Sequence, residues 1–256
     1  MPRLRLLDHA AVRSAVAREL GRDIEYHASI ESTQGRARAL AGDGSGALIV
    51  VADEQRAGQG THGRTWHAAA GTSLLASWIV RPAPVAPGLF AALAGVAVAR
   101  ALEGLGATGA HLKWPNDVEL AGKKVAGALA HGSSDGGGGV LVLGIGVNVH
   151  QGADDFPPEL RASATSLAMA GSPVDRLALL ARLTDELDRL EAAGGREVAM
   201  VEWRQRSTLI GRQVEVRISG RDAFGGVVTA IDDDGALLVR TSGGVERIFA
   251  GDVTAL

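Results

Sequence analysis

A glycine-rich segment that follows an apolar run constrains this chain more than any other part of its sequence. The segment extends from Gln55 to Trp66 and has three glycines within six residues: Gly58, Gly60 and Gly63. The apolar run at 47–52 before it predicts a buried strand. Glycines after a strand let backbone N–H groups approach an anion, and Arg64 adds a permanently charged, forked donor. The pattern favours a loop that binds a phosphorylated ligand.

The spacing of these glycines does not match the common nucleotide-binding loops. The P-loop pattern Gly-x-x-x-x-Gly-Lys-Ser/Thr is absent. The letters Gly-x-Gly-x-x-Gly are present, but a dinucleotide loop would open a helix, and residues 72–80 instead read as a second strand. A flexible turn is the alternative interpretation of this segment when it is taken alone.

The composition is that of a folded globular protein with many loops. The 256 residues suffice for one large domain or for one medium and one small domain. The chain has 35 glycines, about twice the usual ~7% share, which favours a strand-rich protein over a helical bundle. The net charge of −3 gives no basic field for nucleic acid. The absence of cysteine excludes disulfides, thiolate catalysis and Cys-based metal sites.

No part of the sequence predicts a secretory leader or a membrane span. The N-terminus lacks an apolar core of signal-peptide length. The longest apolar stretch, at 91–105, is interrupted by Gly95, Arg100 and Glu103 and so falls short of the ~18 apolar residues of a spanning helix. We therefore expect a cytoplasmic protein with no membrane partner.

The order of the predicted elements favours an α+β fold, because helices and strands are mixed without strict βαβ alternation. Helices are predicted over 9–20, from Ser32 or Thr33 to about Leu40, over 87–104, and near 174–192 and 196–208. Strands are predicted near 47–53, 73–80, 112–114 and 140–149, with a hairpin over 118–129 that turns at Ala121-Gly122.

The pattern changes after Gly211. Four short β-type runs follow, with turns at Asp232-Asp-Asp-Gly235 and Ser242-Gly-Gly244; the runs are 213–218, 223–231, 236–241 and 245–249. A barrel of this size would be marginal alone, so we expect it to lean on the larger part of the chain. The predicted domains are 1–209 and 210–256.

Three further polar clusters lie near the ends of predicted strands. Lys113-Trp-Pro-Asn-Asp117 brings a cation, an amide and a carboxylate together, and Pro115 restricts the preceding residue to extended geometry. Lys123-Lys124-Val-Ala-Gly127 lies on the returning strand of the hairpin, and Gly144-Ile-Gly-Val-Asn148 ends an apolar strand. Each cluster alone is equally an ordinary turn or a set of solvated charges. The histidines do not form a spaced metal set, so no metal ligand is assigned.

Together with the glycine-rich loop, these clusters resemble the motifs of the biotin–protein ligase family. The family's Lys-Trp-Pro-Asn-Asp motif corresponds to 113–117, its Lys-[Leu/Val]-Ala-Gly motif to 124–127, and its Gly-x-Gly-[Ile/Val]-Asn motif to 144–148. The Ser32-Thr33 pair and residues 164–167 also look like family features. The resemblance covers about residues 25–256. It implies a class II synthetase-like mixed sheet flanked by helices, followed by an SH3-like barrel.

The resemblance implies a two-step reaction with ATP, Mg²⁺ and biotin. Biotin attacks the α-phosphate of ATP to give biotinyl-5′-adenylate and pyrophosphate, and a lysine of an acceptor domain then attacks the acyl carbon and releases AMP. The first step brings an anion against a polyanion, so cations must offset the repulsion. Arg64, Lys113 and Lys124 are available for this, with Mg²⁺ bridging phosphate oxygens. An amine nucleophile must lose a proton, and Asp117 is expected to orient or deprotonate it.

The resemblance also assigns the site residues. The catalytic set is Lys124, Lys113, Arg64 and Asp117. The biotin site is expected to contain Ser32, Thr33, Gln34, Gln55, Gln59, Gly60, Thr61, Lys124 and Gly127. The ATP site is expected to contain Gly58, Gly60, Gly63, Arg64, Trp66, Lys113, Asn116 and Asn148. Trp66 is expected either to pack over the ligand or to belong to the core.

The loop departs from the family's usual pattern Gly-Arg-Gly-Arg-x-Gly-Arg. Gln59 and Thr61 stand in place of the first two arginines, and His62 occupies the variable position. The second of these arginines is expected to help close the loop over biotin and to retain the adenylate. We therefore predict weaker retention of the intermediate in this chain.

The implied acceptor is a biotin carboxyl carrier domain of a biotin-dependent carboxylase, and the chain is expected to be a monomer or a weak homodimer. Because only 31 residues precede the Ser32-Thr33 pair, we expect a monofunctional ligase without an N-terminal DNA-binding domain and without a DNA partner. One alternative is a lipoate or octanoate ligase or transferase of the same fold. Another is a non-catalytic biotin- or nucleotide-binding regulator. The Lys-Trp-Pro-Asn-Asp motif and the C-terminal barrel favour biotin.

Overall fold

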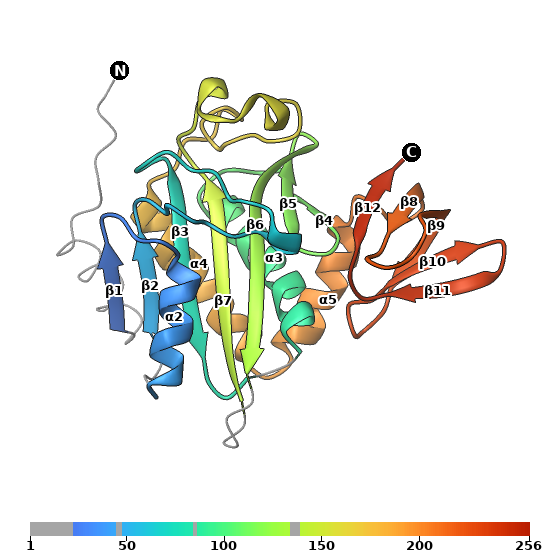
Figure 1. Ribbon diagram of the computed structural model, residues 1–256, viewed down its shortest axis with the longest axis horizontal. Coiled ribbons are helices and arrows are strands. Elements are labelled where there is room, and N and C mark those ends of the chain that lie inside the picture. Colours follow the sequence, from blue (N-terminus) through green and yellow to red (C-terminus); the bar gives the residue numbers. More distant parts are fainter. Residues whose placement is uncertain (1–22, 45–47, 84–85, 134–138) are drawn as a thin grey trace.

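The computed structural model describes residues 23–44, 48–83, 86–133 and 139–256, and these residues build two separate sheets, the larger of which is flanked by helices (Figure 1). The larger sheet has seven strands and the smaller has five. This arrangement confirms the predicted α+β fold with a small C-terminal β unit. The helix expected over 9–20 lies outside the described residues.

The seven-stranded sheet is mixed and has the order β1-β2-β3-β7-β6-β5-β4. Its strands are β1 (Asp23–His27), β2 (Leu48–Ala52), β3 (Ser73–Val80), β4 (His111–Lys113), β5 (Asp117–Leu120), β6 (Lys123–Ser133) and β7 (Val140–Asn148). β1 and β2 are parallel, and the other neighbours are antiparallel. The edge strand β1 was not predicted, because Asp-Ile-Glu-Tyr-His has only two apolar positions.

Helices cover both faces of this sheet (Figure 1). Helix α2 (Thr33–Gly42) packs on β2, β3 and β7 from one side. On the other side, α3 (Pro87–Gly104) packs on β4 to β7 and contacts α4 (Arg176–Glu191) and α5 (Gly195–Arg206). All eight residues of β3 are buried, because helices lie over both of its faces. Helix α3 is long and apolar enough to cross a membrane by length and composition alone, but 67% of it is buried inside the fold, as expected for a core helix.

The sequence explains where these helices begin. Ser32 caps α2, because its Oγ accepts a hydrogen bond from the Gly35 amide at 3.2 Å. Helix α3 begins at Pro87, a residue suited to the first helical turn because its fixed φ matches the helix. Both helix starts match the predicted positions.

The C-terminal sheet is antiparallel and has the order β11-β10-β9-β8-β12. Its strands are β8 (Gln213–Arg217), β9 (Phe224–Ile231), β10 (Leu237–Thr241), β11 (Gly244–Ile248) and β12 (Asp252–Ala255). The prediction of four strands was wrong: the missed strand, β12, has four residues with a single buried position, which is too short for a clear alternation.

The small sheet packs against the larger unit, as expected from its small size. The Trp114 indole N–H donates to the Gly235 carbonyl at 2.9 Å, and the Arg204 Nε–H donates to the Ile231 carbonyl at 2.7 Å. The boundary between residues 209 and 210 stays a prediction.

Candidate active site

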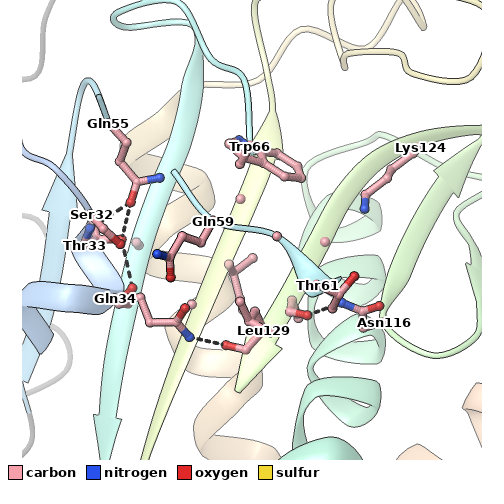
Figure 2. Close-up of a pocket in the computed structure, with 18 residues that line it drawn as sticks. Ser32, Thr33, Gln34, Gln55, Gln59, Thr61, Trp66, Asn116, Lys124 and Leu129 are labelled. Atoms are coloured by element: carbon pink, nitrogen blue, oxygen red, sulfur yellow. Dashed lines mark hydrogen bonds between the residues drawn. The ribbon is translucent and has the colours of Figure 1, made fainter. Parts of the chain in front are cut away.

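Two adjoining cavities lie at the glycine-rich loop and share part of their walls. The first extends between the start of α2 and strands β3, β6 and β7, and Figure 2 shows its lining residues. The second extends from the loop toward β5 and the segment at 156–164. Four residues line both cavities: Gly60, Thr61, Trp66 and Lys124.

A network of neutral side chains organises the first cavity (Figure 2). The Gln55 side-chain oxygen accepts hydrogen bonds from the Thr33 amide at 2.8 Å and from the Thr33 hydroxyl at 2.9 Å. The same hydroxyl lies 2.9 Å from the Ser77 Oγ. The Gln34 amide nitrogen donates to the Leu129 carbonyl at 2.6 Å. Because these contacts fix the side chains before a ligand binds, the cavity presents preset hydroxyl and amide groups.

The two glycines of the Gly-x-Gly-x-Asn motif make room for this arrangement. A Cβ atom at Gly144 would lie 3.3 Å from the side-chain carbon Cδ of Gln34. A Cβ atom at Gly146 would lie 2.6 Å from the indole ring of Trp66, which is closer than real Cβ contacts. The motif therefore lets Gln34 and the indole lie directly against β7.

The glycine-rich loop folds back on itself. The Gly60 amide donates to the Arg64 carbonyl at 2.7 Å, and the Trp66 amide donates to the Gly58 carbonyl at 3.0 Å. A 3₁₀ turn, η1 (Thr61–Gly63), joins the two arms. Gly63 has a φ of +71°, a conformation that favours glycine. Gly58 and Gly63 therefore shape the loop and do not line either cavity.

Trp66 separates the two cavities. Its ring packs on Gly146, and the Lys124 Nζ lies 5.7 Å from the ring centroid. Its indole nitrogen is buried and has no hydrogen-bond partner among the described residues. Of the two interpretations of this residue, the structure favours the one at the ligand site.

Charged side chains line the second cavity, and they include the whole predicted catalytic set: Arg64, Lys113, Asp117 and Lys124. The Lys124 Nζ lies 2.6 Å from the Asp117 carboxylate. Arg64 forms an ion pair with Asp252 of β12, which joins the loop to the C-terminal sheet. Two of the cations in this wall are thus paired with carboxylates of the protein itself.

The two asparagines of the motifs lie in different cavities. Asn148 lines the second cavity; its side chain donates to the Thr165 carbonyl at 3.0 Å and accepts from the Gln151 side chain at 3.0 Å. Asn116 lines the first cavity and donates to the Ala128 carbonyl. The structure therefore places Asn148 among the predicted nucleotide residues and Asn116 among the predicted biotin residues.

All of the predicted biotin residues line the first cavity: Ser32, Thr33, Gln34, Gln55, Gln59, Gly60, Thr61, Lys124 and Gly127. The sequence did not identify Ser77, although a serine inside the buried strand β3 is a usable signal. It also missed Glu119, two residues after Asp117 on β5 and so on the same face of the strand. Burial raises the pKa of the Glu119 carboxyl.

Comparison with known proteins agrees with this geometry. Residues 28–148 match the model of the biotin/lipoate A/B protein ligase family, and residues 209–254 match the biotin protein ligase C-terminal domain. The chain is 33% identical over 258 residues to the bifunctional ligase/repressor BirA of Bacillus spizizenii, covering 96% of this chain and 78% of the relative. It is 35% identical over 231 residues to the biotin–[acetyl-CoA-carboxylase] ligase of Mycobacterium tuberculosis, covering 86% and 83%.

A solved structure is similar over most of the chain. It is the biotin protein ligase of Aquifex aeolicus in complex with biotin and ATP, with a TM-score of 0.75 and 27% identity. The alignment covers 91% of this chain and 97% of that one.

Proposed function

The chain belongs to the biotin protein ligase family, and from that premise we propose that it joins biotin to a specific lysine of a biotin carboxyl carrier domain through a biotinyl-adenylate. It is a ligase enzyme that acts on biotin and uses ATP. The carrier domain as acceptor is supported by similarity to a relative described as a biotin–[acetyl-CoA-carboxylase] ligase.

One observation carries the proposal: a neutral cavity and a charged cavity meet at Lys124. The ureido ring of biotin is uncharged and has both donors and acceptors, which suits the Thr33, Gln55 and Ser77 network. ATP is a polyanion, which suits the wall with Arg64 and Lys113. Lys124 lies at the junction, where the biotin carboxylate and the α-phosphate would meet.

In the first step a carboxylate oxygen forms a bond to the α-phosphorus, and the bond to the pyrophosphate oxygen breaks. Negative charge gathers on the phosphate oxygens, so fixed cations lower the barrier. Lys124 would hold the biotin carboxylate, and Arg64 and Lys113 would face the phosphates. For Lys124 to do so, its ammonium must exchange Asp117 for the ligand.

Mg²⁺ would enter with the nucleotide. No group of three or more His, Asp or Glu side chains that could hold a metal ion occurs among the described residues. Mg²⁺ commonly keeps several waters and is bound by one or two carboxylates together with substrate phosphates, so the residues of the second cavity are compatible with it. Its part would be to neutralise charge on the phosphates.

In the second step the acceptor lysine attacks the acyl carbon, and AMP leaves. Asp117 is on the second cavity's wall and would orient the amine once Lys124 has turned to the ligand. A cytoplasmic location, a monomer or weak homodimer, and the absence of DNA and membrane partners stay predictions.

Exchange of labelled pyrophosphate into ATP tests the proposal. We expect exchange that depends on biotin and does not occur with lipoate. Exchange with lipoate would move the chain to the lipoate side of the family, and exchange with neither would favour the binding-protein alternative. Incorporation of biotin into a purified carrier domain, and its loss when the acceptor lysine is replaced by arginine, tests the acceptor.

A further inference from the structure

Glu119 lines the second cavity and has no part in the reaction as described so far. Strand β5 alternates, with Val118 and Leu120 buried in the core and Asp117 and Glu119 on the cavity side. The cavity wall thus contains two carboxylates from one strand.

The two carboxylates differ in their partners. Asp117 is engaged by the Lys124 ammonium at 2.6 Å. The Glu119 side chain forms no hydrogen bond or ion pair with any residue that the structure describes, although Glu119 lies opposite Lys124 of β6 and His111 of β4 in the sheet register. Glu119 is therefore a half-buried carboxylate that faces the cavity without a fixed partner.

A carboxylate in this position does not help the first step. ATP and the biotin carboxylate are anions, and a further negative charge raises the electrostatic cost of bringing them together. The second step differs, because a lysine side chain approaches as an ammonium cation, and the adenylate carries only one negative charge. Charge complementarity therefore points to the acceptor lysine as the partner of Glu119.

Resting on the proposed function, we propose that Glu119 receives the proton that the acceptor lysine must lose before it attacks the biotinyl-adenylate. The ammonium gives one proton to the Glu119 carboxylate, and the neutral amine forms a C–N bond at the acyl carbon. The bond between that carbon and the phosphate oxygen then breaks, and AMP takes the electron pair. The second proton leaves the nitrogen as the adduct collapses and passes to the departing phosphate or to water.

The surroundings of Glu119 suit a proton acceptor. Burial raises the pKa of its carboxyl, and Asp117 raises it further, while Lys113, His111 and Lys124 act in the opposite direction. A carboxylate with a raised pKa binds a proton more readily than an exposed one. Its pKa then lies closer to the pKa of the lysine ammonium from which it takes the proton. Asp117, freed when Lys124 turns to the ligand, would orient the amine, and Glu119 would take the proton.

The test separates the two half-reactions in the full-length protein. Glu119→Gln is compared with wild type and with Glu197→Gln, which removes the same charge from an exposed position on α5 outside both cavities. Pyrophosphate exchange measures the first step. Single-turnover transfer from biotinyl-adenylate measures the second step, with a purified carrier domain or with hydroxylamine as the nucleophile. Hydroxylamine is largely neutral at pH 7.5 and needs no base to lose a proton before attack.

We expect Glu119→Gln to keep exchange within about twofold of wild type and to slow transfer to the carrier lysine by ~10²-fold, a typical contribution of general base catalysis. With hydroxylamine as the nucleophile, Glu119→Gln and Glu197→Gln should both react at the wild-type rate. The variant's transfer rate should also rise about tenfold per pH unit between pH 6.5 and 8.5, because only the lysine's own ionisation then supplies free amine.

Three results would overturn this role. Wild-type transfer to the carrier lysine by Glu119→Gln would show that no proton passes through Glu119. Equal slowing with lysine and with hydroxylamine would indicate a general disturbance of the site. Loss of pyrophosphate exchange together with a higher Mg²⁺ requirement would assign the carboxylate to the metal. If wild type itself shows no biotin-dependent exchange, the proposed function fails first, and the two failures are thereby distinguished.

Discussion

The two cavities are prepared for their ligands in different ways. In the first, neutral groups are already bonded to one another, as in the contacts of Thr33 with Gln55 and Ser77. In the second, Lys124 is paired with Asp117 and Arg64 with Asp252. A ligand in the first cavity meets fixed groups, whereas a ligand in the second must displace carboxylates from the cations that bind it.

This difference predicts how each cavity responds to mutation. A preorganised neutral network contributes affinity because little order is lost on binding, so breaking it should weaken one ligand specifically. Each paired cation must leave its carboxylate before it can bind the ligand. The net free energy gained on binding is therefore the difference between the cation–ligand pair and the cation–carboxylate pair. Removing a cation should therefore slow the chemistry, whereas removing a partner with no other part in the reaction, such as Asp252, should have a small effect of opposite sign.

The largest effect is expected for Lys124→Gln, because this side chain lines both cavities. Biotin-dependent pyrophosphate exchange should fall by ~10²–10³-fold, the usual loss when one preorganised donor is removed from a developing anion. The neighbouring Lys123 lines neither cavity, so Lys123→Gln is the matched control and should stay within about twofold of wild type. Retention of full exchange in Lys124→Gln would contradict the junction on which the proposed function rests.

The next effect tests the neutral network through Thr33→Val. Thr33 is only 3% exposed, and the change removes its hydroxyl and leaves the Ser77 hydroxyl without this partner. An unsatisfied buried polar group costs about 1–3 kcal/mol, so the Kd for biotin should rise by ~5- to 150-fold. Isothermal titration should show unchanged ATP affinity. Thr229→Val, at an exposed position on β9, serves as the control, and an equal loss for both ligands would show that the cavities are not separable.

The sequence predicted those parts of the molecule that depend on local pattern. Helix α3 was placed at its observed ends, because Pro87 and the apolar run define them, and the motif residues around Thr33 and Gln55 do line the first cavity. Pairings between distant segments could not be predicted. Asp252 meets Arg64 across 188 positions, and this contact depends on how the C-terminal sheet packs against the glycine-rich loop.

Residues without a family motif were missed for a related reason. From the sequence, Glu119 is indistinguishable from a solvated charge on a hairpin. Only the structure of β5 shows that it lines the second cavity. By contrast, Asn116 belongs to the Lys-Trp-Pro-Asn-Asp motif; its side chain donates to the Ala128 carbonyl in the wall of the first cavity, and its expected contact with the nucleotide stays a prediction. Side-chain direction at a strand end depends on tertiary contacts that a linear motif does not contain.

A smaller effect is expected at Thr61, which lines both cavities at the position where the family pattern has arginine. Thr61→Arg adds a cation beside the bound adenylate and should slow its release several-fold, about 1 kcal/mol for a partly exposed charge pair. The measurement is the rate at which labelled biotinyl-adenylate leaves the enzyme in the absence of an acceptor. An unchanged release rate would show that the loop arginine is not what retains the intermediate.

The smallest effect is expected for Asp252→Asn, and its sign is the sharpest test of the comparison between the cavities. The side chains of Arg64 and Asp252 are 58% and 51% exposed, so their ion pair contributes at most about 1 kcal/mol. Freed from Asp252, the guanidinium can turn to the phosphates without first leaving a partner, and the KM for ATP should fall by up to about fivefold at low salt. High salt weakens the pair in wild type and should remove most of the difference. The control is Glu215→Gln, which loses a charge from the exposed pair with Arg217 on the adjacent strand β8 and should leave the KM unchanged. A rise in the KM for ATP would mean that Asp252 instead positions Arg64 for the nucleotide, and the second cavity would then be as preorganised as the first.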